Sequence, residues 1–401
     1  MSRETGQGNQ GFETTAIHGT EGESGDPWRA LTPPLYMTST YTFPEMEEVD
    51  RVLRGDREGY VYSRAGNPTV RSLERTVALL EGAALGCAFS SGMGAISAVL
   101  LSILKKGQSL VFSRHLYSGT RHFVESMLTP LGATVHFVDF READWEIRLE
   151  SCLDKNSGGL FLETPSNPTL DIVDLARVGS ICRKKGVPLV VDNTFASPAL
   201  QNPLRLGADI VIHSATKYLG GHGDLLGGVA VGSEERIRPL LSEDGPLLGA
   251  TLSPMNAWLI LRGIKTLALR MEAHSLRAIS LSRQLSGHPK VERVFYPGLA
   301  THPGHGIARG QMKGMGGMLS LQLPSLALAR KFMDGLRIVR IGVSLGDPAS
   351  LVEHPASMSH RGWPQEARRT MGIEDGLVRM SVGLESLEDL QDDVEQALRS
   401  L

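Results

Sequence analysis

Cysteine is scarce in this chain of 401 residues: there are three, Cys87, Cys152 and Cys182, and no two of them form a CxxC pair. An odd number of widely spaced cysteines argues against a disulfide framework and against a zinc site built on cysteines. The same count is typical of proteins kept reduced in the cytoplasm, which is where we expect this protein to be located.

Long apolar runs and an excess of charge of one sign are also missing. No run approaches the roughly 20 residues that a membrane span requires, and residues 1–11 are polar, unlike the apolar segment of a secretory signal. The 41 basic and 44 acidic residues give a net charge of −3, so neither nucleic acid nor a membrane is an expected partner. The hydrophobic content of 41% is that of an ordinary globular protein.

We expect three regions along the chain. Residues 1–60 form an N-terminal arm, polar, Gly-rich and flexible over about its first half, residues 61–255 form a larger domain, and residues 256–401 form a C-terminal domain. A single long helical pattern that begins at Ser253 and runs through Met271 is expected to connect the two domains. The C-terminal domain has strand patterns near 317–322 and 337–342, a strand around Arg379, and a helical pattern near 386–400.

Strand and helix patterns alternate between residues 84 and 232, which predicts an α/β fold with a mostly parallel central sheet. Ligands of such sheets bind beyond the carboxyl ends of the strands. Asp192 and Lys217 both follow apolar strands, so both can face one crevice. The helical patterns lie near 93–104, 120–130, 174–185 and 202–206, and the strand patterns near 109–112, 135–138, 159–163, 188–192, 209–213 and 228–231.

Lys217 and Asp192 together indicate pyridoxal 5′-phosphate (PLP) as the cofactor. The aldehyde of PLP needs an amine for a Schiff base, and its ring nitrogen needs an acid that keeps it protonated, so that the ring can act as an electron sink. Lys217 follows the hydroxyl residues Ser214 and Thr216, which suit the phosphate. A lysine alone would more often be a surface residue, and an acid alone might cap a helix, so the pair carries the inference.

Ser91-Gly92-Met93-Gly94 leads into a helical pattern and can form a phosphate cup, because small residues expose backbone N–H groups at a helix N-terminus. A simple tight turn before a helix is the alternative interpretation. The segment is half of a dinucleotide-binding GxGxxG motif, but Ser97 stands at the third glycine position, which argues against a nicotinamide-dependent oxidoreductase.

Three further sites have alternative interpretations. Tyr117, in a loop after a strand, can stack on a cofactor ring and exchange a proton, or can simply pack in the fold. Arg379 lies among apolar residues and can bind a carboxylate, either of a substrate or of a structural acid. His354 and His360 are spaced unlike metal ligands on one helical face, so we expect loop structure and no metal site.

Taken together, the chain from about residue 12 to its end resembles the cystathionine γ-synthase-like, or Cys/Met metabolism, family of fold-type I PLP enzymes. The motifs that carry the resemblance are Tyr62-Ser63-Arg64, Asn67-Pro68-Thr69, Ser91-Gly92-Met93-Gly94-Ala95, Glu163-Thr164-Pro165-Ser166-Asn167-Pro168, Val191-Asp192-Asn193-Thr194-Phe195, Ser214-Ala215-Thr216-Lys217-Tyr218, Ser344-Leu345-Gly346 and the Arg379 strand. With every expected cofactor position filled, a non-catalytic member of the fold is disfavoured.

The resemblance implies a role for each candidate residue. Residues 61–255 become the PLP-binding domain, in which Lys217 holds the cofactor and moves protons. The remaining cofactor contacts would come from Asp192 at the ring nitrogen, Tyr117 stacked on the ring, Asn167 near its phenolic oxygen, and Gly92, Met93, Ser214 and Thr216 at the phosphate. Arg379, helped by Ser344, would bind the α-carboxylate of a small amino-acid substrate.

The resemblance also implies an assembly. Tyr62 and Arg64 would reach the cofactor phosphate of a neighbouring subunit, so the active sites would be shared across a dimer. Two such dimers would associate into a homotetramer.

The implied reaction is γ-elimination on a sulfur amino acid, and the pattern is most similar to methionine γ-lyases, which form 2-oxobutanoate, ammonia and methanethiol. Val343 supports this, because family members that handle cystathionine often have a glutamate there. Gly119 departs from the cysteine usual in methionine γ-lyases, and Gly245-Pro246-Leu247-Leu248 lacks their Lys-Asp pair. The alternatives are therefore an O-acylhomoserine sulfhydrylase, a cystathionine γ-synthase or a cystathionine γ-lyase.

Overall fold

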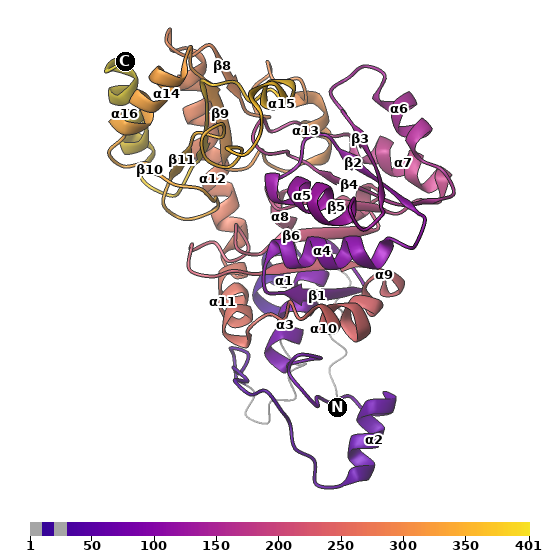
Figure 1. Cartoon of the computed structure of the whole chain (residues 1–401). Helices are drawn as coiled ribbons and strands as arrows, with labels where there is room; N and C mark the ends of the chain where they lie inside the picture. The colour runs from indigo at the N-terminus through magenta and orange to yellow at the C-terminus, as the bar shows by residue number, and fades with distance from the viewer. Residues whose placement is uncertain (1–9, 20–29) are drawn as a thin grey trace.

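The computed structural model describes residues 10–19 and 30–401, and it contains two sheets in an α/β arrangement (Figure 1). The larger sheet has seven strands in the order β1-β7-β6-β5-β4-β2-β3, and all of them are parallel except β7. The predicted α/β fold with a mostly parallel central sheet is therefore confirmed. The strands are β1 (Leu85–Phe89), β2 (Ser109–Ser113), β3 (Thr134–Val138), β4 (Ser157–Glu163), β5 (Leu189–Asp192), β6 (Ile210–Ser214) and β7 (Gly228–Gly232).

Helices cover both faces of this sheet because side chains alternate along its strands. On β6, Ile210 and Ile212 pack toward α4, whereas Val211 packs toward α3 and α11. The elements of this part of the chain are α1 (Phe12–His18), α2 (Met46–Arg54), α3 (Pro68–Glu81), α4 (Gly92–Ile103), α5 (Ser118–Phe123), η1 (Val124–Leu128), α6 (Trp145–Cys152), α7 (Leu175–Lys185), α8 (Ser197–Leu200), η2 (Pro203–Leu206), α9 (Glu234–Pro239), η3 (Leu240–Asp244), α10 (Gly245–Leu248) and α11 (Pro254–Ile264).

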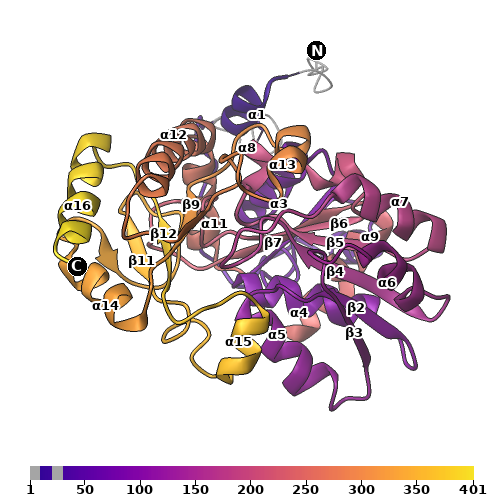
Figure 2. The ribbon, with the colours of Figure 1, turned by 90° about the horizontal axis from the view of Figure 1, so that it is seen from above.

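The second sheet has five strands in the order β10-β11-β12-β9-β8, mostly antiparallel, and lies beside the first (Figure 2). Its core is formed with α12, α14 and α16, which are amphipathic helices. The elements are α12 (Leu267–Ser286), β8 (Arg293–Phe295), α13 (His305–Gln311), β9 (Met318–Gln322), α14 (Leu326–Gly335), β10 (Arg340–Ile341), β11 (Leu351–Glu353), α15 (Gln365–Thr370), β12 (Leu377–Ser381) and α16 (Leu387–Arg399). Domain limits at residues 60 and 255 stay a prediction.

The expected flexible arm is wrong in one respect. Residues 12–18 form helix α1, whose Ala16 is buried in the core cluster with α3, because Phe12 and Ala16 give this polar segment a small apolar face. The parts of the arm in residues 1–9 and 20–29 lie outside the described residues. Further along, residues 30–66 are mostly extended, and α2 projects from the body of the molecule (Figure 1).

Several helices and strands were not predicted from the sequence patterns. Strand β1 has the weakly β-forming sequence Leu-Gly-Cys-Ala-Phe, and its Gly86 is needed because a Cβ there would lie 2.5 Å from the Glu74 carbonyl of α3. Helix α6 and the short strands β8 and β11 were also not predicted, and the strand expected over 337–342 is reduced to two residues, Arg340 and Ile341. Among the described residues, no helix is both long enough and apolar enough to cross a bilayer.

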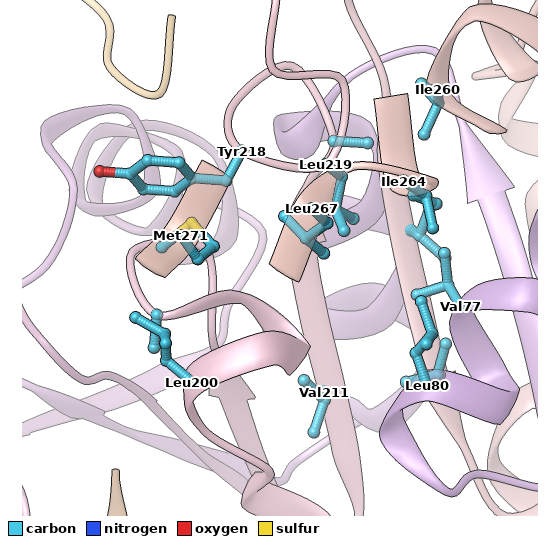
Figure 3. Close-up of a cluster of buried hydrophobic side chains, with 14 of the residues drawn as sticks. Val77, Leu80, Leu200, Val211, Tyr218, Leu219, Ile260, Ile264, Leu267 and Met271 are labelled. Atoms are coloured by element: carbon cyan, nitrogen blue, oxygen red, sulfur yellow. The ribbon is translucent and has the colours of Figure 1, made fainter. Parts of the chain in front are cut away.

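The long helix predicted from Ser253 is in fact two helices, α11 and α12, separated at Lys265 and Thr266. Arg270 explains how the break is accommodated, since its buried guanidinium donates to the Gly263 carbonyl at 2.7 Å and to the Tyr218 carbonyl at 2.8 Å. The first of these carbonyls belongs to the last turn of α11, and it also accepts a hydrogen bond from the Thr266 N–H at 3.2 Å. Around this junction the buried side chains of both helices pack against α3 and the sheet (Figure 3).

We predict that Arg270→Ala lowers the free energy of unfolding by about 2–4 kcal/mol, because it removes the guanidinium donor of the Tyr218 carbonyl and one donor of the Gly263 carbonyl and leaves a cavity in the core. Chemical denaturation monitored by circular dichroism measures this loss. Arg330→Ala, on the exposed surface of α14, is the matched control and should change stability little. An Arg270→Ala protein as stable as the control would contradict this account of the junction.

Candidate active site

A cavity of about 470 Å³ opens at the carboxyl ends of the parallel strands, between the two sheets. It is lined by predicted residues from both domains, which confirms that the topology brings them together. Tyr62 and Arg64 are not among the described residues that line it. The predicted residues in its wall are Gly92, Met93, Tyr117, Asn167, Asp192, Ser214, Thr216, Lys217, Ser344 and Arg379.

One end of the cavity is suited to an anion. Helix α4 begins there at Gly92, and Ser91 caps it by accepting a hydrogen bond from the Gly94 N–H at 3.0 Å. The N–H groups of its first turn face the side of β6, and the helix dipole favours negative charge at this position. Gly92 is required by this close approach, because a Cβ there would lie 2.8 Å from the Cβ of Ser214.

The Lys217 side chain reaches across the cavity to the C-terminal domain. Its Nζ donates a hydrogen bond to Ser344 Oγ at 2.6 Å. Burial, and after it the nearby positive charge of Arg379, lower the pKa of Lys217 to about 8, with Glu353 acting in the opposite direction. An amine with this pKa is partly neutral near physiological pH, so it can act as a nucleophile or as a base.

Two acids lie side by side at the carboxyl ends of β4 and β5. Asp192 and Glu163 are partners in the parallel register, and both line the cavity. Burial raises the pKa of Asp192, while a hydrogen bond from Thr194 opposes the shift. Burial and the charge of Asp192 together raise the pKa of Glu163 well above its usual range. A cationic ring nitrogen beside Asp192 would relieve this repulsion, which fits the expected cofactor.

Glu163 was not singled out in the sequence, although it lies in one of the quoted motifs. Its carboxylate accepts a hydrogen bond from the Tyr117 N–H and so ties the loop after β2 to the end of β4. The Tyr117 ring is 44% exposed at the cavity mouth. Its neighbour Gly119 is close to the ring, since a Cβ there would lie 2.5 Å from Tyr117 Cε1. An acid in the strand register position next to Asp192 was the signal that could have identified Glu163.

Arg379 is almost completely buried and faces the same cavity from β12. Its Nη1 donates to Asn167 Oδ1 at 2.8 Å and lies 3.0 Å from Glu353 Oε1, and its Nη2 donates to the Ser344 carbonyl at 2.9 Å. Burial lowers the pKa of Arg379, and Glu353 opposes this shift. Glu353 is a second acid of the site that the sequence patterns did not identify.

Tyr62 and Arg64 follow directly after the arm and do not line this chain's own cavity. Arg64 donates to the Pro246 carbonyl at 3.2 Å and stacks near the Tyr62 ring, which is 46% exposed. His354 and His360 are bound within their loop, to Ser357 and Ser359 respectively. In residues 10–19 and 30–401 there is no group of three or more His, Cys, Asp or Glu placed to hold a metal ion.

The cavity fits PLP on three independent observations. Gly92 and the start of α4 offer backbone donors beside the hydroxyls of Ser214 and Thr216 for a phosphate. Lys217 has an amine that is deprotonated more easily than an ordinary lysine. Asp192 supplies a carboxylate whose raised pKa reflects the need for a positive partner.

Comparisons with known proteins agree with this chemistry. The family model described as Cys/Met metabolism PLP-dependent enzyme matches residues 13–399. The chain is 44% identical to an L-methionine γ-lyase from Fusobacterium nucleatum over 396 residues, which cover 98% of each chain. PLP is thus the cofactor of the family to which this match assigns the chain.

Two solved structures show the same architecture. A cystathionine γ-synthase from Xanthomonas oryzae has a TM-score of 0.91 and 39% identity, with 98% of each chain covered. A Campylobacter jejuni protein that contains N′-pyridoxyl-lysine-5′-monophosphate has a TM-score of 0.92 and 30% identity, with 97% of this chain and 100% of that chain covered.

We predict that the Lys217 amine of the cofactor-free protein gains reactivity around pH 8, far below the ordinary lysine value of 10.5, because burial disfavours its charged form. Labelling with a neutral amine-reactive reagent at graded pH, followed by peptide mass spectrometry, measures this. The exposed Lys184 serves as an internal reference for the reagent. Labelling of Lys217 that begins only above about pH 10 would refute the assignment.

Proposed function

Because the chain belongs to the Cys/Met metabolism family of PLP-dependent enzymes, we propose that it acts as a methionine γ-lyase. In this reaction L-methionine is converted to 2-oxobutanoate, ammonia and methanethiol. The observation that carries the proposal is the apolar wall at Val343. This side chain lines the cavity directly beside Ser344, where the short thioether of methionine can pack and a second amino group would find no carboxylate from this position.

The L-methionine γ-lyase relative supports the same substrate, since its identity extends over nearly the whole chain. When bound, PLP supplies an electron sink for negative charge that develops on the substrate. Everything else in the reaction falls to the protein's own side chains, which must orient the substrate and move its protons.

We assign the binding roles as follows. Arg379 and Ser344 hold the α-carboxylate of the substrate, which places its Cα beside Lys217 Nζ. Asp192 would balance the charge of the cofactor ring, and Asn167 would bind near its phenolic oxygen. Gly92 and Met93 offer backbone N–H groups to the phosphate, next to the hydroxyls of Ser214 and Thr216.

Two residues move protons. Lys217, with a pKa of about 8, accepts the Cα proton and then transfers protons between neighbouring carbons. Tyr117 is placed at the cavity mouth, where its phenol donates a proton to the departing thiolate. The Glu163 carboxylate holds the Tyr117 backbone in this position.

The main alternative is γ-replacement, in which a thiol or sulfide displaces the acyl group of an O-acylhomoserine, as in a sulfhydrylase or a cystathionine γ-synthase. Gly119 favours this alternative, because it stands where methionine γ-lyases usually have cysteine, and the cystathionine γ-synthase from Xanthomonas oryzae shares the fold at 39% identity. Cystathionine γ-lyase activity is the third candidate.

We further propose a cytoplasmic homotetramer built from two dimers whose active sites are shared. Apolar side chains stay exposed on the single chain along the arm and near the cavity mouth, which is the kind of surface that a second subunit covers. Tyr62 and Arg64 follow directly after this arm and do not line their own cavity, as a contribution to a partner's site requires. These exposed side chains are Leu31, Met37, Met46, Leu53, Leu226, Leu247, Leu248 and Met255.

We predict that the PLP-loaded protein releases 2-oxobutanoate and methanethiol from L-methionine faster than it forms thioethers from O-acetyl- or O-succinylhomoserine with cysteine or sulfide. Parallel assays of both reactions measure the preference. Lys217→Ala should abolish turnover in either assay, because the amine that moves the protons is removed. Inert methionine with rapid thiol capture would replace the proposal by γ-replacement, and a fully active Lys217→Ala variant would refute the site.

We also predict that two inactive variants complement each other. Lys217→Ala and Arg64→Ala chains, unfolded together and refolded as a mixture, should recover activity well above either variant refolded alone, because a mixed dimer contains one site with both residues intact. The measurement is 2-oxobutanoate formation with the total protein held constant. Activity of the mixture equal to the sum of the parents would exclude shared sites.

A further inference from the structure

Glu353 and Arg379 form a cross-strand pair between β11 and β12, where they are direct partners in the antiparallel register. Their side chains are 1% and 5% exposed, and the two atoms Arg379 Nη1 and Glu353 Oε1 are 3.0 Å apart. Ser359 Oγ donates a hydrogen bond to the same carboxylate oxygen at 2.9 Å. Glu353 is thus held on two sides while it lines the cavity.

The guanidinium of Arg379 has a free edge. Nη1 faces Asn167 and Glu353, and Nη2 uses one of its two hydrogens on the Ser344 carbonyl. Nε is buried and has no hydrogen-bond partner in the described part of the chain. Nε and Nη2 form one edge of the planar guanidinium, and the N–H groups of such an edge match the spacing of the two oxygens of a carboxylate.

His360, which contacts Ser359, adds no second positive charge next to Glu353. A hydroxyl has one proton, and that of Ser359 is donated to Glu353, so the His360 Nδ1 that lies 3.0 Å from Ser359 Oγ must itself be the donor. Burial lowers the pKa of His360 to about 4, so the ring is neutral at physiological pH.

We propose that Glu353 is a positioning residue that sets how tightly Arg379 binds the substrate carboxylate. It holds Nη1 on one side of the guanidinium, which leaves the edge of Nε and Nη2 for the substrate carboxylate, and its negative charge offsets part of the positive charge offered to the ligand. The inference rests on the proposed function, in which Arg379 binds the α-carboxylate. Binding of substrate and release of product are thereby balanced, because a fully uncompensated buried arginine would retain any carboxylate.

The test compares two unreactive inhibitors of the PLP-loaded enzyme, 4-(methylthio)butanoate and its primary amide, which differ in the carboxylate alone. Glu353→Gln keeps an oxygen near Nη1 but removes the negative charge. We expect the ratio of the two inhibition constants, carboxylate over amide, to fall about tenfold. Asn167→Asp adds a charge at the other Nη1 contact and should shift the same ratio about tenfold in the opposite direction. In Glu353→Gln the KM for methionine should also fall.

Asp393→Asn is the matched control. Asp393 is a buried carboxylate of the same domain that accepts hydrogen bonds from the N–H groups of residues 337–339, so its variant loses stability without touching the cavity. It should leave the ratio of the two inhibition constants unchanged, which separates a charge effect from a general loss of stability.

The outcomes are distinct. The role of Glu353 would be overturned if the ratio of the inhibition constants, carboxylate over amide, were unchanged or higher in Glu353→Gln. It would also be overturned if this ratio were unchanged or lower in Asn167→Asp. Either variant suffices if the other does not fold. A wild-type enzyme that binds the amide as well as the carboxylate would instead refute carboxylate recognition by Arg379, and with it that part of the proposed function.

Discussion

The chemistry of this protein depends on charged groups that are withdrawn from water at one edge of a parallel sheet. Burial lowers the pKa of Lys217 and raises that of Asp192, so the neutral form of each group is favoured. In the proposed function, the Lys217 amine would pair with the aldehyde of the cofactor, and the Asp192 carboxylate with its protonated ring nitrogen. The carboxyl edge of the sheet would thus provide both of these contacts to one cofactor.

The two domains complete the site by reaching across the cavity. Lys217 bonds to Ser344, and Arg379 bonds to Asn167, so each domain supplies one partner of each contact. These bonds require the second sheet to sit at a defined place next to the first. The α11–α12 junction provides this, because Arg270 ties the start of α12 to the carbonyl of Tyr218, the residue that directly follows Lys217. Core packing and site geometry are therefore linked through a single buried side chain.

Buried acids that do not touch the expected ligands directly have a large influence on those that do. Glu163 holds the backbone of Tyr117, and burial and the charge of Asp192 raise its own pKa, while Glu353 holds Arg379 and counters its effect on the pKa of Lys217. Both acids lie at strand ends in register with a functional residue. Their charges are effective because the surrounding protein screens them poorly compared with water.

Periodicity and motif spacing were sufficient to predict the parallel sheet and the strands that end at Asp192 and before Lys217, because these features are local or follow from the way parallel strands align. Other cavity residues, such as Asn167 and Ser344, were expected only from the family resemblance. Strand β1 was not predicted because its small residues have a weak strand propensity. They form a strand because α3 packs close to Gly86. The break after α11 and the partners Glu163 and Glu353 were decided by the tertiary structure alone, since a buried hydrogen bond or ion pair depends on which distant segments meet. Asp192 and Lys217 could thus be identified from local sequence, whereas the buried acids Glu163 and Glu353 next to the functional residues could be identified only from the packing of distant segments.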